Sequence, residues 1–211
     1  MRIEVKGLKE AMANLSPSKV EKAARSALNR VKNQAKTEAV RTMSRTWNIS
    51  QGNLQRKSSG RDRIHVSGFV GSDLTAHIYF MAGGISLTYF GATELRFRGN
   101  TLVKINRKVG KAVRSKREDL GVKVQLLRGG KTARLRGFLA AVAYGKNGAQ
   151  GYHLGVFARH GKQRTPIYER KMISVATMIR KPEVIEPLQK FIVQKFDERF
   201  AHELKRQGMT K

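Results

Sequence analysis

Residues 16–43, SPSKVEKAARSALNRVKNQAKTEAVRTM, carry the most regular pattern of the chain. Ser16 supplies a capping hydroxyl, and Pro17 suits the first helical position because the N–H that it lacks has no partner there. Apolar residues then recur at steps of three and four, on one helical face: Val20, Ala24, Ala27, Val31, Ala35, Ala39 and Met43. The pattern predicts a helix of about 28 residues, roughly 42 Å long, whose alanine-rich face a neighbouring backbone can approach closely.

A second long helix is predicted at the other end of the chain. Pro182 opens it, and Gly208 stands where a helix is expected to stop. Its wide apolar face is formed by Val184, Ile185, Leu188, Phe191, Ile192, Phe196, Phe200 and Leu204. Its acidic and basic residues balance, so we expect this helix to pack on a sheet beside the first helix rather than to face a polyanion.

The residues between the two helices have the alternation and the turn residues of β-strands. We expect strands at 64–70, 76–81, 85–90, 122–127, 133–142 and 152–157, with Gly83 and Gly84 as a hairpin turn and 128–131 as another. The fold class is therefore α+β, with a central antiparallel β-sheet or small sandwich flanked by the long N-terminal and C-terminal helices. We expect residues 1–211 to form a single domain.

Residues 45–57, RTWNISQGNLQRK, predict a short helix capped by Ser50. The segment has features of a helix-turn-helix recognition segment, but a DNA reader of that class needs a compact three-helix unit. The residues that follow are β in character. We therefore expect a short helix that packs Trp47 and Leu54 into a core or an interface.

The charge of the chain is its unusual property. Its 43 Lys and Arg against 15 Asp and Glu give a net charge of +28. Such an excess needs a polyanion, an acidic partner or dispersal over a large assembly. The chain has no signal-peptide pattern and no apolar run long enough to span a bilayer, which predicts a soluble protein made in a cytoplasm, without a membrane partner.

The most basic segment runs from Arg96 to Arg136. The weak periodicity from Gly91 to Asp119 predicts a long loop or hairpin arm. The candidate partner or DNA contacts in it are Arg96, Arg98, Lys104, Arg107, Lys108, Lys111, Arg114, Lys116 and Arg117. Phe97 is the one aromatic residue of this arm, so a nucleic acid would be held by its phosphates, without sequence preference. The alternatives are a solvated, mobile arm and an arm that becomes ordered on an acidic neighbouring subunit.

The sequence lacks a recognisable catalytic constellation. The absence of cysteine excludes disulfides, Cys-ligated zinc and thiol catalysis. Lys131 follows Gly130 as in a phosphate-binding loop, but Gln125 occupies the place of the first glycine of that motif, so a hairpin turn is the better interpretation.

The five histidines lack metal-ligand spacing, and His65 and His77 are expected to lie on strands. The adjacent acids cannot form the opposed acid/base pair of a glycosidase, and the sequence has no Gly-x-Ser-x-Gly elbow. These absences predict a protein that is not an enzyme and binds no cofactor or metal.

Three blocks of sequence, in this order, resemble the minor tail protein Z family of lambda-like phages, which is related to broader tail-completion families. The first is VKGLK at 5–9, followed by ALNRV at 27–31. The second is ISLTYFGA at 85–92, with GFLA at 137–140. The third is GVFARHGKQRTPI at 155–167, which resembles the family's turn pattern through Arg159, Gly161, Lys162, Arg164 and Pro166. The segment 93–119 is longer and more basic than the family pattern, so the resemblance assigns it no role.

The resemblance implies a structural virion protein of a tailed bacteriophage, a minor tail or tail-completion protein at the head–tail neck that is assembled in the host cytoplasm. Its partners would be other tail and neck proteins, further copies in a homo-oligomeric ring (a hexamer is favoured), and packaged DNA touched through phosphates. A ring needs head-to-tail interfaces, and the alanine-rich first helix is the candidate for one. The alternative is a stand-alone nucleic-acid-binding protein without sequence specificity, which the charge alone favours.

Overall fold

The computed structural model describes residues 2–3, 16–58, 60–67, 74–98, 101–105, 119–143, 151–161 and 165–207. The chain forms two compact units, each assembled from separate stretches of sequence. Unit 1 comprises Met1–Ser44, Leu54–Ala82 and Val175–Lys211, and unit 2 comprises Arg45–Asn53 and Gly83–Ser174. Whether the two act as the single expected domain of residues 1–211 stays a prediction.

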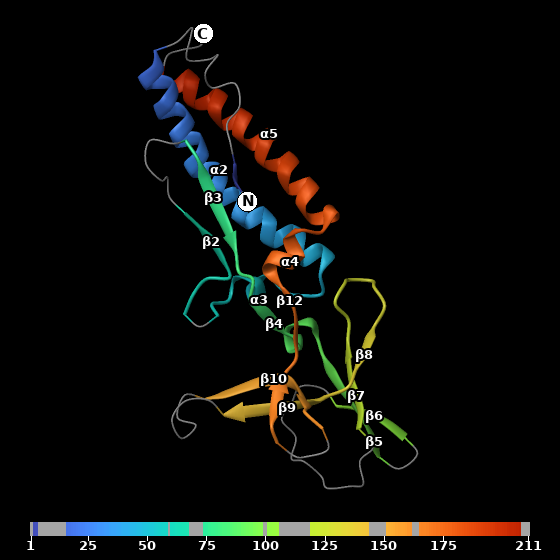
Figure 1. The fold of residues 1–211 in the computed structure, drawn as a ribbon. Coiled ribbons are helices and arrows are strands. Elements are labelled where there is room, and N and C mark those ends of the chain that lie inside the picture. The colour runs from blue at the N-terminus through green and yellow to red at the C-terminus, as the bar shows by residue number, and fades with distance from the viewer. Residues whose placement is uncertain are drawn as a thin grey trace. The chain divides into compact units, whose positions relative to one another are not determined.

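Unit 1 contains the two long helices (Figure 1). Its elements are β1 (Arg2–Ile3), α2 (Pro17–Thr46, whose last two residues belong to unit 2), β2 (Ile64–Val66), β3 (Ala76–Phe80), α4 (Val175–Ile179) and α5 (Pro182–Arg206). The strands form an antiparallel sheet in the order β1-β3-β2. Both helices begin at the proline that the sequence indicated, and they pack together, as expected.

Unit 2 is built from small antiparallel sheets. Its strands are β4 (Gly84–Ser86), β5 (Thr93–Arg98), β6 (Thr101–Ile105), β7 (Asp119–Val124), β8 (Ala133–Leu135), β9 (Phe138–Ala143), β10 (Tyr152–Arg159), β11 (Ile167–Glu169) and β12 (Lys171–Ser174), with a 3-10 turn, η1, at Leu87–Phe90. They pair in the orders β6-β5-β7-β8, β11-β10-β9 and β12-β4. The short helix α3 (Gln51–Gln55) lies at the boundary between the units along the chain. The α+β class is confirmed, with several small sheets between the two long helices along the chain.

The expected strand at 85–90 is wrong over most of its length. The strand ends at Ser86, and η1 follows, closed by Gly91 with φ 72° and an N–H that bonds Thr88 O at 3.3 Å. Ser86 and Thr88 also bond each other through their hydroxyls at 3.1 Å. Short hydroxyl side chains offer local bonds that compete with a strand ladder, which explains the early turn.

The expected hairpin across Gly83 and Gly84 is also wrong, because β4 pairs with β12 and not with β3. Gly84 permits this pairing: a Cβ there would lie 2.7 Å from the Cβ of Lys171. The expected strand at 133–142 is divided in two at Gly137, whose φ is 151°. The hairpin joined by residues 128–131 is confirmed, since β7 and β8 pair antiparallel.

The alanine stripe of α2 is covered within this chain. Ala24, Ala27, Ala35 and Ala39 have no exposed surface, and the same is true of Leu28. Small side chains let other elements of unit 1 pack against the helix backbone, and this packing uses the face expected to form a ring interface. The expectation that the alanine face forms an interface between copies is therefore wrong.

The start of unit 2 is fixed by Asn48. Its side-chain amide donates to Phe90 O at 3.1 Å and to Gln125 O at 3.0 Å, and its backbone N–H donates to Leu126 O at 2.8 Å. Trp47 forms an isolated bridge with Leu127 and is 7% exposed. As expected, Trp47 and Leu54 are buried. The helix-turn-helix alternative fails because α3 is followed by β2 and not by the further helix that a compact three-helix unit needs.

Candidate functional site

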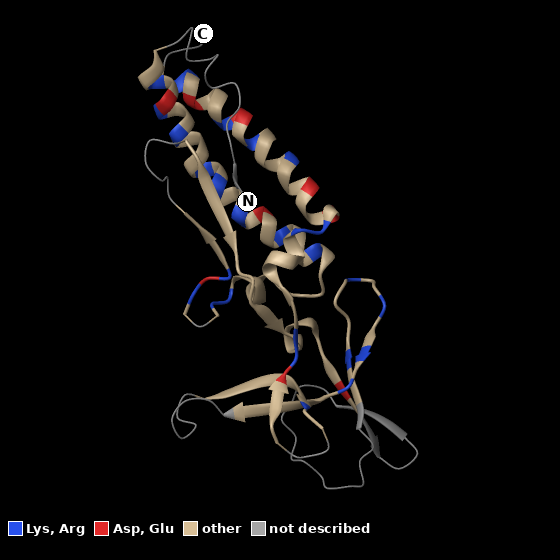
Figure 2. Ribbon diagram, in the orientation of Figure 1, with Lys and Arg blue, Asp and Glu red and all other residues tan. Residues whose placement is uncertain are grey.

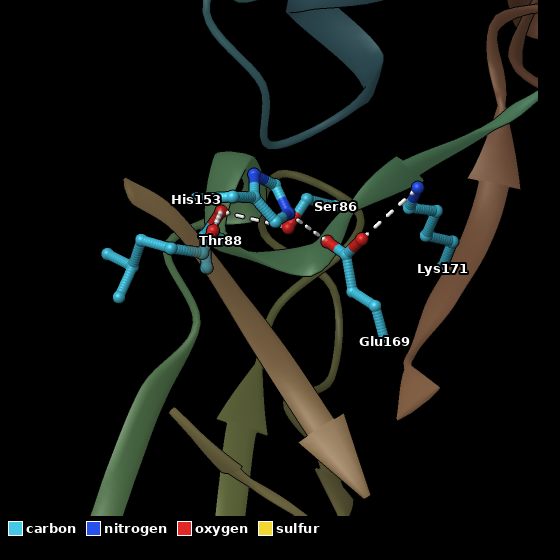
Figure 3. A network of polar contacts seen from close by, with 6 residues as sticks. Ser86, Thr88, His153, Glu169 and Lys171 are labelled. Atoms are coloured by element: carbon cyan, nitrogen blue, oxygen red, sulfur yellow. Dashed lines mark hydrogen bonds and ion pairs between the residues drawn. The ribbon is translucent and has the colours of Figure 1, made fainter. Parts of the chain in front are cut away.

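A cluster of polar side chains joins five elements of unit 2, and we call it the Glu169 cluster (Figure 3). It contains Ser86 of β4, Thr88 of η1, His153 of β10, Glu169 of β11 and Lys171 of β12. Glu169 Oε1 lies 2.7 Å from His153 Nε2, and its Oε2 lies 3.1 Å from Lys171 Nζ. Thr88 Oγ1 continues the chain of bonds to the carbonyl oxygen of Leu154 at 3.3 Å. One carboxylate thus connects the β11-β10-β9 sheet to the β12-β4 pair.

The charge of Glu169 is stabilised by these partners. Burial raises the pKa of its carboxyl, since the side chain is 13% exposed, but hydrogen bonds from His153, Lys171 and Ser86 outweigh burial and lower the pKa below its ordinary value of 4.5. Glu169 is therefore ionised at neutral pH. An ionised carboxylate that accepts several hydrogen bonds is a strong tie between strands.

Gly155 makes room for this carboxylate. It lies two residues from His153 along β10, and a Cβ at this position would be 3.0 Å from Glu169 Oε1 and 2.9 Å from Phe157 Cε2. The glycine of the third sequence block is thus explained by packing, because any side chain would push the carboxylate away from His153.

The turn motif of the third block lies at the end of β10. Arg159 is the last residue of β10, and its guanidinium carbon is 4.7 Å from the ring centroid of Phe138, a cation–π contact. Gly161 has φ 80°, which favours glycine, and the Thr165–Pro166 peptide is cis. Lys162 and Arg164 lie outside the described residues. A role of this motif in contacting a partner stays a prediction.

The predicted basic arm is placed only in part. Residues 93–98 and 101–105 pair as a hairpin, β5–β6, so the loop alternative does not hold for them. Arg96, Arg98 and Lys104 lie on these two strands. The remaining predicted contacts, Arg107, Lys108, Lys111, Arg114, Lys116 and Arg117, lie outside the described residues. Their contact with DNA or with a neighbouring subunit stays a prediction.

The charges are distributed unevenly between the units (Figure 2). Unit 1 has 22 Lys and Arg and 11 Asp and Glu, whereas unit 2 has 21 and four. Ion pairs in unit 1 include Arg25–Glu21 at 3.0 Å and Lys195–Glu198 at 2.6 Å. Sequence reasoning located the excess charge in the middle of the chain but did not find the Glu169 cluster, because its members come from separate elements.

The described histidines do not form a metal centre. His65 of β2 and His77 of β3 both stack on Tyr79, with ring centroids 6.3 and 5.9 Å away, and His160 contacts the ring of Tyr168. In the ranges that the structure describes, no group of three or more His, Asp or Glu side chains could hold a metal ion. No helix within those ranges is both long and apolar enough to cross a membrane.

Comparison with known proteins decides the family. The family model described as prophage minor tail protein Z (GPZ) matches residues 5–210. This chain belongs to the minor tail protein Z family. The resemblance carried by the three sequence blocks is thereby confirmed. Searches of curated protein sequences and of solved structures found no match.

Membership of the minor tail protein Z family has direct consequences. The chain is a structural component of a phage tail and not an enzyme, as the missing catalytic constellations predicted. A tail component works by contact with other tail proteins. The match favours a tail component over the alternative of a stand-alone nucleic-acid-binding protein.

Proposed function

We propose that this minor tail protein completes the tail at the head–tail junction, where copies assemble into a ring, with a hexamer favoured, and touch the DNA that passes from head to tail. The observation that carries the proposal is the charge of unit 2, with 21 cationic residues against four acids in a chain of a tail family. A ring multiplies that charge around one axis. Repulsion between the positive charges would oppose such a ring unless a polyanion or acidic subunits neutralised them.

The first test concerns the virion. Phage particles produced without this protein should show defective tails or heads without tails by electron microscopy, and supplying the protein in trans should restore them. Tails of normal form that join heads and infect would contradict the proposal.

The ring needs a surface other than the alanine face of α2. Large apolar side chains are exposed in unit 2 at Tyr152, Ile167, Tyr168 and Met172. Tyrosine and methionine are enriched in protein interfaces, and β11 is an edge strand of its sheet. We therefore place the contact with a neighbouring copy on the exposed faces of β10, β11 and β12.

Met172→Arg tests this surface, because an arginine is tolerated in water but disrupts an apolar contact. The side chain of Met172 is 54% exposed, and that of Val193 on α5 is 62% exposed, so Val193→Arg is a matched control. By mass photometry, Met172→Arg should convert ring-sized particles to single chains, with at least a tenfold loss in the apparent affinity between copies. Val193→Arg should leave the ring-sized particles unchanged. Equal behaviour of the two variants would remove this surface from the proposal.

A further inference from the structure

The β7–β8 hairpin presents cations from both of its strands and from its turn. From Asp119, the first residue of β7, to Arg136 the chain has five Lys and Arg and one acidic residue, Asp119 itself. Lys123, Arg128, Lys131 and Arg136 are all exposed. Lys123 lies between Val122 and Val124, which are 0% and 1% exposed, so strand alternation directs it outward.

Among the described side chains, the acid on the neighbouring strand β5 does not share this outer face. Glu94 of β5 lies opposite Val122 and is buried with it, so its carboxylate is on the inner side of the sheet. Lys123 is instead flanked by Thr93 on β5 and by Arg134 on β8. The cross-strand neighbours of Lys123 are thus a neutral threonine and a second cation.

The hairpin is held in a fixed conformation. The backbone N–H of Gly130 donates to Leu127 O at 3.2 Å, and the Gln125 side chain donates to Gly130 O at 2.9 Å across the turn. The N–H of Arg128 donates to Thr46 O at 3.0 Å. A preorganised surface loses little entropy when it binds, so these cations can hold a ligand without first becoming ordered.

The chemistry of the face distinguishes between the possible partners. Protein interfaces are anchored by aromatic and apolar side chains, and single-stranded nucleic acids are held by stacking on aromatic rings. The large exposed apolar residues of the described chain all lie outside residues 119–136. A face of cations without such anchors fits evenly spaced phosphates on a rigid duplex.

We propose that the β7–β8 hairpin binds the phosphate backbone of duplex DNA, through Lys123, Arg128, Lys131 and Arg136. This inference rests on the proposed contact with DNA in the tail, and it assigns that contact to a hairpin distinct from the arm at 91–119. Because its contacts are to phosphates, the binding carries no base-sequence information.

The test is a salt titration of the full-length protein on duplex DNA. Each phosphate contact contributes about 0.9 to the slope of log K against log salt. The variant K123Q/R128Q/K131Q/R136Q should therefore lower the magnitude of the slope by about 3 to 4. A control, K19Q/K22Q/K190Q/K205Q, removes the same charge from exposed positions of α2 and α5 in unit 1 and should change the slope by less than about 1.

Two further measurements separate the outcomes. R128K/R136K keeps the charge and should keep the slope, and a single strand of equal length should bind more weakly than the duplex.

Equal slopes for the hairpin variant and the control would overturn the assignment to this hairpin while leaving a DNA contact elsewhere. A hairpin variant that binds DNA normally but no longer enters tails would indicate an acidic protein partner and would also overturn it. Failure of the wild-type protein to bind duplex DNA at low salt would overturn the DNA contact of the proposed function as well.

Discussion

Unit 1 and unit 2 hold almost the same number of cations but differ in what surrounds them. In unit 1, acids pair with cations at helical spacing, as in Arg25–Glu21 and Lys195–Glu198. The helix α2 buries its alanine stripe, and α5 buries Val184, Leu188 and Ile192. In unit 2, where acids are few, His153 and Lys171 converge on one carboxylate, that of Glu169. The comparison teaches that unit 1 has one acid for every two cations, whereas unit 2 has about one for every five, so the charge of unit 2 is the less balanced.

The largest expected effect is on the backbone of unit 2. Gly121 has φ 81°, and a Cβ there would overlap the backbone oxygen of Leu135 on β8. Gly121→Ala should lower the free energy of unfolding by about 3 kcal/mol, because the strained φ and the overlap act together. Denaturant unfolding followed by circular dichroism measures it.

Gly52→Ala is the matched control for that variant. Gly52 lies in α3, and no atom lies within 4 Å of the place where its Cβ would stand, so alanine should be neutral or stabilise by up to about 1 kcal/mol. If both alanines had the same effect, the close approach of β7 to β8 at Gly121 would be contradicted.

The next effect concerns the packing of unit 1. Ala27→Leu should cost about 2 kcal/mol in the isolated protein, because Ala27 has no exposed surface and no room for a larger side chain. Lys22→Leu, at an exposed position of the same helix, should cost little. A variant Ala27→Leu that unfolds like the wild type but fails to form rings would restore the alanine face as a subunit interface.

The smallest effect is that of the Glu169 cluster, and it depends on pH. Because the folded state holds the pKa of Glu169 below 4.5, the carboxylate contributes stability that is complete above pH 4.5 and is lost as the pH falls through the lowered pKa. Glu169→Gln should cost about 1 kcal/mol at neutral pH, since His153 and Lys171 are partly solvated and regain water. The difference in Tm between wild type and variant should shrink on acidification; a difference that stays constant down to strong acid would contradict this role.

The sequence predicted the parts of the fold that depend on neighbouring residues. The starts of α2 and α5 follow from Pro17 and Pro182, and the β7–β8 turn follows from its two glycines. Prediction from the sequence failed where strands pair over a long distance along the chain. Nothing near Gly84 indicates that Lys171 lies beside it. The Glu169 cluster was missed for the same reason, although the pairing of β10 with β11 brings His153 and Glu169 into one sheet.

The alanine stripe shows a different kind of failure. Its spacing correctly predicted one close-packed face, but a pattern of small residues does not reveal whether the neighbour belongs to the same chain or to another. The burial of Ala27 and Ala35 within this chain supplies that information. The charge excess and its place in the middle of the chain were visible in the sequence, whereas the assignment of that segment to a separate unit required the structure.

The most direct test of the account is a cryo-electron microscopy map of complete phage particles at a resolution that traces this chain. The account predicts a ring of copies at the head–tail junction, with the β7–β8 hairpin directed towards the DNA channel and density of the duplex backbone within reach of Lys131. A map in which unit 2 faces solvent on the outside of the tail, with its cations far from DNA, would contradict it.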